Sequence, residues 1–237
     1  MLVGLLIGTV GVGGVLMVSF LALFGGVDIH QAAATSLFSF LFTGILGTWL
    51  YARRGSIRWR IAIPVCVGAL LFGWLGAAAA AEVDSRPLAT AIAAIIVAAG
   101  VYTFVPESRS ARRRDGAGAG ESWLLASVGA ASGFGSGFSG AGGPIFSVPL
   151  MVILRYAPLT AVATSQVLQI VAALSGSIEN ARQAFIDWRI AALISVFQLA
   201  GVVFGVRLAH AASARVLRSL AGALCIASGG LLLARSL

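Results

Sequence analysis

The sequence predicts an all-α, polytopic integral membrane protein with about eight transmembrane or re-entrant helical segments. Three observations predict this fold class. Hydrophobic residues make up 59% of the chain and charged residues only 10%. A soluble domain carries roughly 25% charged residues to cover its surface, so most of this exterior must face hydrocarbon. Apolar stretches of about 20 residues, the length that a helix needs to cross a bilayer, also recur along the chain.

Polar, proline-bearing or glycine-bearing connectors separate the apolar stretches. The stretches are 2–24, 31–51, 61–81, 87–105, 123–154, 158–178, 190–210 and 216–233. The longest connector, 106–121, contains Arg112–Arg114 and an alternating Gly-Ala run. This composition predicts a flexible hinge between two halves.

The second half of the chain repeats the first. Thr35-Ser36 recurs as Thr164-Ser165, a shift of 164 − 35 = 129 residues, and the same shift carries Trp59-Arg60 to Trp188-Arg189. Many glycines match at this shift without a gap. We therefore predict two homologous four-segment repeats, 1–105 and 122–237, joined by the basic, Gly-rich linker 106–121.

The net charge of +8 comes from arginines, since the chain has no lysine. Half of them stand in short runs between apolar stretches, at 53–60 and 109–114. This placement is typical of cytoplasmic loops under the positive-inside rule and not of a nucleic-acid-binding face. The predicted partner is the lipid bilayer, and no nucleic acid is expected. The sequence leaves open whether the chain forms a homo-oligomer.

Dense glycine clusters occupy matching places in the first and fifth apolar stretches. Each glycine costs a helix about 1 kcal/mol relative to alanine, so we expect broken helices there. Broken backbone at membrane depth occurs only where it lines a cavity or is buried in protein. Its free N–H groups, with the positive end of a half-helix, would suit an anion. The cluster residues are Gly11, Gly13, Gly14, Gly140, Gly142 and Gly143, followed by Pro144, which suits a first helical position.

Wider-spaced glycines have a simpler interpretation. Gly4 and Gly8, and Gly129, Gly133 and Gly137, are four residues apart. This spacing favours close packing between membrane helices.

Polar side chains in the second and sixth stretches are the other candidates for solute binding. Hydroxyls and amides can replace part of an anion's hydration shell, although Ser and Thr also bond back to their own helix. The candidates are Thr35, Ser36, Thr164, Ser165, Gln166 and Gln169. No acidic residue or lysine lies centrally in any stretch, which argues against a cation site. No spacing indicates a metal site, and no cofactor is expected.

The second glycine cluster belongs to a longer motif. Gly140-Ala-Gly142-Gly143 is followed by Val148-Pro149 and then by Ala163-Thr164-Ser165. This pattern resembles the sulfite exporter TauE/SafE family over nearly the whole chain. The first copy departs from it, since Val18-Ser19 stands in place of Val-Pro.

The resemblance implies a secondary transporter in a bacterial inner membrane, multi-pass, with its site near the two Gly motifs. The implied function is export of a small anion such as sulfite, a sulfonate or a related organosulfur or carboxylate anion.

Two alternatives remain. Gly137-Phe-Ser139-Gly140 resembles the motif of rhomboid intramembrane proteases, but a serine protease needs a nearby base, and the two histidines, His30 and His210, lie in a loop and at the end of a stretch. We therefore do not expect this protein to be an enzyme. The second alternative is a non-transporting membrane scaffold.

The topology is open as well. Eight crossings would make the halves parallel, whereas re-entrant hairpins at 2–24 and 123–154 would make them inverted.

Overall fold

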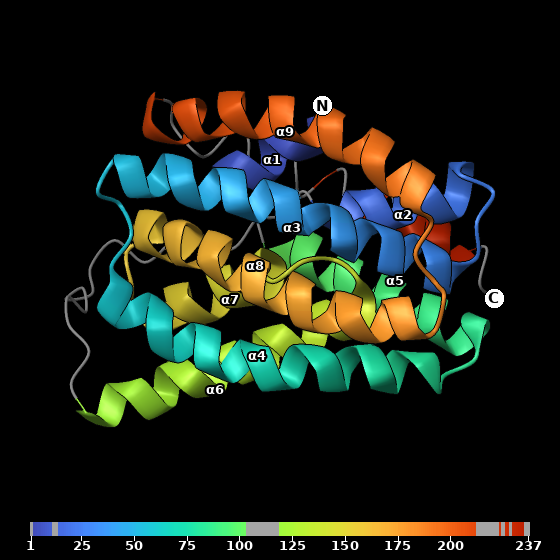
Figure 1. Ribbon diagram of the computed structural model, residues 1–237, viewed down its shortest axis with the longest axis horizontal. Coiled ribbons are helices and arrows are strands. Elements are labelled where there is room, and N and C mark those ends of the chain that lie inside the picture. Colours follow the sequence, from blue (N-terminus) through green and yellow to red (C-terminus); the bar gives the residue numbers. More distant parts are fainter. Residues whose placement is uncertain are drawn as a thin grey trace.

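A computed structural model of the protein describes residues 2–10, 14–102, 119–211, 223, 226–227 and 229–234. All regular secondary structure in these residues is helical, which confirms the all-α prediction (Figure 1). The helices are α1 (Leu2–Val10), α2 (Gly14–Phe24), α3 (Ile29–Arg53), α4 (Trp59–Ala81), α5 (Ser85–Tyr102), α6 (Ala119–Ser139), α7 (Pro144–Ile153), α8 (Pro158–Arg182) and α9 (Trp188–Ala211).

Four helices of the described chain are long and apolar enough to cross a membrane: Ile29–Arg53, Trp59–Ala81, Pro158–Arg182 and Trp188–Leu208. They coincide with four of the predicted stretches to within a few residues. The stretch 87–105 corresponds to the shorter helix α5. Most of 216–233 and of the linker 106–121 lies outside the described residues, although α6 already begins at the end of that linker.

The other two predicted stretches are each divided into two helices. The stretch 2–24 becomes α1 and α2, and the stretch 123–154 becomes α6 and α7. Between α6 and α7 the backbone of Gly140 has φ +65° and that of Gly142 has φ +82°. Only glycine adopts this left-handed region without a Cβ penalty. Pro144 begins α7, as its missing N–H predicts.

Glycines bring the backbones of the two halves into contact. A Cβ on Gly137 of α6 would meet the carbonyl oxygen of Gly73 in α4, and one on Gly8 of α1 would lie 2.8 Å from that of Val202 in α9. Both pairs are related by the 129-residue shift (8 + 129 = 137; 73 + 129 = 202). The packing interpretation of the wider-spaced glycines is therefore confirmed, and the last long helix of each half packs on the first helix of the other.

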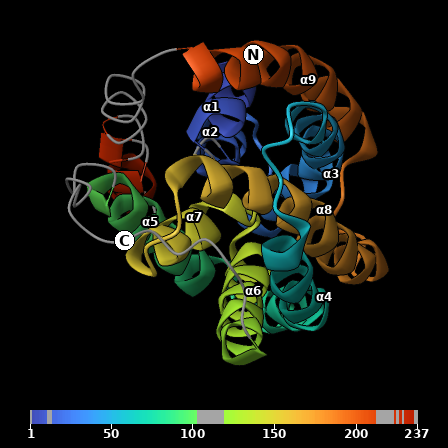
Figure 2. The ribbon, with the colours of Figure 1, turned by 90° about the vertical axis from the view of Figure 1, so that its left-hand side faces the viewer.

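Helices α3 and α8 run antiparallel through the centre of the bundle (Figure 1). Near the start of α3, the Thr35 Oγ1 accepts a hydrogen bond from the backbone N–H of Asp187, just beyond the end of α8. Further along, Gly47 of α3 contacts the side chain of Gln166, near the start of α8. Figure 2 views the bundle end-on and shows α8 in its interior, between α3 and α7.

Charged residues divide unevenly between the two ends of the bundle. One end, at the left of Figure 1, holds the α3–α4 and α7–α8 connections and the last turns of α9; there Arg54 Nη1 donates to the carbonyl of Val206 at 3.0 Å. Among the described residues, this arginine-rich end carries Glu121 and the arginines Arg53, Arg54, Arg58, Arg60, Arg155 and Arg207. The opposite, acidic end carries Arg86, Arg182 and Arg189 with Asp28, Glu82, Asp84, Glu179 and Asp187.

Candidate functional site

The break between α6 and α7 is enclosed by the two central helices. A Cβ on Gly140 would strike the backbone of Ala33 in α3, and one on Gly142 would lie 3.2 Å from the ring of Phe40. On the other side, Gly143 lies against the side chain of Leu168 in α8. All three glycines are buried. The second predicted glycine cluster therefore lies inside the protein, between α3 and α8.

The first glycine cluster meets the second at this place. Gly14, the first residue of α2, lies against the carbonyl oxygen of Ala141, and a Cβ on it would be 3.3 Å from the Phe40 ring. Gly11 and Gly13 lie outside the described residues. The start of α2 and the α6–α7 break thus form one region although they are far apart in sequence.

Some backbone amides of the α6–α7 break are bonded and others are not. Gly140 N donates to Ser136 O at 2.9 Å and Ala141 N to Ser139 Oγ at 3.3 Å, while Phe146 N donates to Gly143 O at 3.2 Å. Pro144 has no N–H. The amides of Gly142, Gly143 and Ile145 have no acceptor within the part of the chain that the structure describes.

These three amides stand at the start of α7, where no side chain caps the helix. The first N–H groups of a helix have no intrahelical partner, and the helix dipole makes this end positive. Buried N–H groups without a partner cost free energy. The site therefore favours a bound group that accepts hydrogen bonds or carries negative charge.

Ser36 adds a side-chain hydroxyl to the same region. It lies on α3 between Ala33 and Phe40, the two residues that contact Gly140 and Gly142. Its side chain is fully buried, and its Oγ has no hydrogen-bond partner among the described residues. A buried hydroxyl of this kind is uncommon unless water or a ligand satisfies it.

Two of the predicted glutamines cross from α8 to neighbouring helices. Gln169 Nε2 donates to the Phe40 carbonyl at 2.9 Å and to Thr43 Oγ1 at 2.8 Å. Gln166 Nε2 donates to the Ile7 carbonyl of α1 at 3.3 Å, and its buried Oε1 has no donor in the described chain. Both side chains are almost completely buried. They extend the polar region from the break along α3 towards the arginine-rich end.

The remaining predicted residues are placed differently. Thr35 binds the backbone of Asp187 where α8 connects to α9. Ser165 Oγ donates to the Val162 carbonyl of its own helix at 2.8 Å. This is the bond to the helix's own backbone that serine often makes instead of binding a solute. Thr164 is buried, and its hydroxyl has no partner within the described residues. The structure therefore brings Ser36 to the break and engages Thr35 and Ser165 elsewhere.

The glutamines also reveal an asymmetry between the halves. At the 129-residue shift, Gln166 and Gln169 correspond to Leu37 and Phe40 (166 − 129 = 37; 169 − 129 = 40). Gln198, which accepts a hydrogen bond from Ser39 at 3.5 Å, corresponds to Ala69. The second half thus contributes amides where the first contributes apolar side chains. Phe40, which sequence reasoning missed, could have been found by this comparison.

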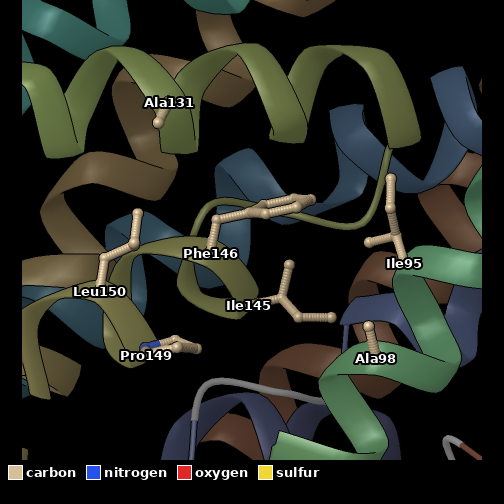
Figure 3. A pocket seen from close by; sticks show the side chains of 7 residues that line it. All are labelled: Ile95, Ala98, Ala131, Ile145, Phe146, Pro149 and Leu150. Atoms are coloured by element: carbon tan, nitrogen blue, oxygen red, sulfur yellow. The ribbon is translucent and has the colours of Figure 1, made fainter. Parts of the chain in front are cut away.

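A cavity of about 320 Å³ adjoins α7 on the side of α5 and α6 (Figure 3). Its lining is apolar throughout and consists of Ile95, Ala98, Ala131, Ile145, Phe146, Pro149 and Leu150. Ile145 and Phe146 follow directly after Pro144, so the cavity begins next to the break. Its apolar walls suit an apolar group, whereas the break offers amides that have no acceptor among the described residues and suit a charged group.

The serine of the protease-like motif is engaged by its own helix. Ser139 Oγ donates to the Gly135 carbonyl at 2.6 Å, at the end of α6. The His30 ring stacks on Phe185, with 5.0 Å between ring centroids. The side chain of His210 lies outside the described residues. In the described chain, Ser139 is therefore the last residue of α6, with its hydroxyl bonded to the preceding turn.

Comparison with known proteins agrees with this architecture. No curated protein and no solved structure gives a significant match. The family model described as "Sulfite exporter TauE/SafE" matches residues 1–232, nearly the whole chain. The helical membrane architecture, the glycine-broken helices and this match together show that the chain belongs to the sulfite exporter TauE/SafE family of membrane anion transporters.

Proposed function

We propose that the protein is a secondary transporter that exports a small oxyanion, such as sulfite or a small sulfonate, across a bacterial inner membrane. The solute binds where the start of α2 meets the α6–α7 break. The observation that carries this proposal is the group of three buried amides, at Gly142, Gly143 and Ile145, that have no acceptor among the described residues.

The donors of this site are neutral. The three amides and the Ser36 hydroxyl can each donate one hydrogen bond, and the start of α7 adds a partial positive charge. No arginine, lysine or acidic residue belongs to the break. A site without a fixed counter-charge holds an oxyanion well enough to select it and weakly enough to release it, as conduction through a membrane requires.

The packing of the two halves supports the repeat organisation. Residues 1–105 and 122–237 act as four-segment repeats, and α4 and α9 each pack on the other repeat. The antiparallel arrangement of α3 and α8 favours the inverted form, in which α1–α2 and α6–α7 are re-entrant hairpins. Inverted repeats with interrupted helices at a central site are a common transporter construction.

The charge distribution supports an orientation. The arginine-rich end faces the cytoplasm, because Lys and Arg are enriched on that side of inner-membrane proteins. An anion leaving the cell then meets the arginines first and reaches the break along the polar row of Gln166 and Gln169. The acidic end faces the outside.

Transport by reconstituted vesicles tests the proposal. The purified chain is placed in vesicles, and uptake of sulfite, methanesulfonate, sulfate and acetate is measured with and without the protein. We expect saturable movement of sulfite or methanesulfonate and little of acetate. A Ser139→Ala variant should still transport, because that hydroxyl donates to its own helix and accepts a bond from the Ala141 amide, and neither contact involves the three amides assigned to the anion. Absence of protein-dependent movement of every anion would favour the scaffold alternative.

A further inference from the structure

One acidic side chain is buried within a membrane-spanning helix. Glu179 of α8 is only 6% exposed, whereas the other acidic residues that the structure describes lie in connections, at caps or in a first helical turn. An ionisable side chain inside a membrane helix is costly and often marks an ion or proton pathway. The sequence alone places Glu179 near the end of a helix and does not show its burial.

The Glu179 carboxylate is held mainly by neutral donors. Trp74 Nε1 of α4 donates to Oε2 at 2.7 Å, and Gln183 Nε2 donates to Oε1 at 3.2 Å. Arg182 lies 3.4 Å from Oε2, but its side chain is 70% exposed, so water screens much of its charge. The shortest bond therefore links α8 to α4 through an indole.

The fold does not require a carboxylate at this position. Glu179 stands in the last turn of α8, where the helix dipole disfavours negative charge. In the other half, the matching residues are Leu50 for Glu179 (179 − 129 = 50) and Val203 for Trp74 (74 + 129 = 203). The corresponding pair of helices in the other half, α3 and α9, packs together without a carboxylate or an indole at these positions. This points to a role for the Glu179 carboxylate other than packing.

Glu179 also lies close to the place where α4, α6 and α8 meet next to the break. One turn earlier in α8, a Cβ on Gly176 would be 3.5 Å from Cα of Gly137 and 3.4 Å from the Gly73 carbonyl. Trp74 follows Gly73 in α4, and Gly137 precedes the α6–α7 break by three residues. The bond between Glu179 and Trp74 therefore links α8 to α4 one turn from the place where both helices contact α6.

We propose that Glu179 is a proton-binding site that couples movement of the anion to movement of a proton. This inference rests on the proposed transport function. Protonation removes the charge that Trp74 and Gln183 stabilise and weakens the link between α4 and α8 next to the break. Other charged or titratable groups around this end of α8 are Arg182, Asp28, His30, Glu82, Asp187 and Arg189.

Proton-driven accumulation tests the coupling. The probe is methanesulfonate, the anion of a strong acid, whose charge does not change with pH. Vesicles carry a pH gradient of about one unit, and potassium with valinomycin holds the membrane potential at zero. With one proton per anion, the parent should accumulate methanesulfonate about tenfold, equivalent to about 1.4 kcal/mol. Glu179→Gln should remove this accumulation and retain exchange of labelled for unlabelled methanesulfonate.

The matched control is Glu82→Gln, the same change at an exposed residue of the acidic end, and it should accumulate like the parent. The coupling would be overturned if vesicles with the parent protein exchanged methanesulfonate but did not accumulate it in response to the pH gradient. Normal accumulation by Glu179→Gln would overturn it as well. Parent vesicles that neither exchange nor accumulate any test anion would instead refute the transport function.

Discussion

Replacing Gly142 with alanine tests the broken helix as the binding site. Gly142 has φ +82°, and holding an alanine in the left-handed region costs about 1–2 kcal/mol. The new methyl would lie 3.2 Å from Cδ2 of Phe40, inside the optimal separation of about 3.5–4.0 Å between carbon atoms. The backbone relieves both costs by rotating, which turns the amides of Gly142 and Gly143 away from the bound anion.

The expected loss follows from the hydrogen bonds involved. A hydrogen bond to a charged group contributes about 1.5–3 kcal/mol. Loss of one such bond lowers kcat/KM for transport by roughly ten- to a hundredfold, since about 1.4 kcal/mol corresponds to a factor of ten. Initial rates of sulfite uptake into vesicles, normalised to correctly folded protein, measure this loss. A thermal melt of each purified variant gives its stability separately.

Gly26→Ala is the matched control for Gly142→Ala. Gly26 has φ +66° in the connection between α2 and α3, and no atom lies within 4 Å of an added Cβ. Its backbone cost is therefore similar, but it does not touch the break. We expect a similar loss of stability and transport within about twofold of the parent. Parental transport by Gly142→Ala, at a stability loss equal to that of the control, would refute the assignment of the site.

Three further predictions concern the side chains, the packing and the orientation. Gln169→Leu should lower the rate of sulfite uptake about tenfold, because it removes two hydrogen bonds to α3, each worth about 0.5–1.5 kcal/mol. An unchanged rate in both Gln169→Leu and Gln169→Asn would argue against a role for the amide. Gly76→Leu should lower the melting temperature and the yield of folded protein, because its Cβ would strike the Phe134 carbonyl; a parental melt would contradict the contact between α4 and α6. After replacement of both native cysteines, a membrane-impermeant thiol reagent added to intact cells should label Asp84→Cys and not Arg58→Cys, and the reverse pattern would invert the orientation.

The linear sequence predicted the helices well because their length and apolar composition are local properties. The bounds of α3 and α8, Ile29–Arg53 and Pro158–Arg182, lie within four residues of the predicted stretches. The break before Pro144 was equally predictable, since glycine and proline act on the backbone where they stand. Neither prediction needed knowledge of what the helix packs against.

The candidate site was predictable only in part. Glycine clustering located the break, and the duplicated Thr-Ser pairs suggested hydroxyl ligands. Of the two first-half hydroxyls, however, Ser36 lies beside the break, whereas Thr35 binds the backbone of Asp187. Adjacent residues point in different directions on a helix, and the sequence does not say which direction faces the centre.

The amino-acid sequence by itself determined that this protein is helical, embedded in a membrane and interrupted at its second glycine cluster, because hydropathy and backbone freedom belong to individual residues. Only the tertiary structure decided that α3 and α8 run antiparallel, that Gly14 meets Ala141, and that Glu179 is buried against Trp74. These arrangements depend on side-chain packing between segments distant in the chain, and a single sequence carries no record of the partner that each face will find.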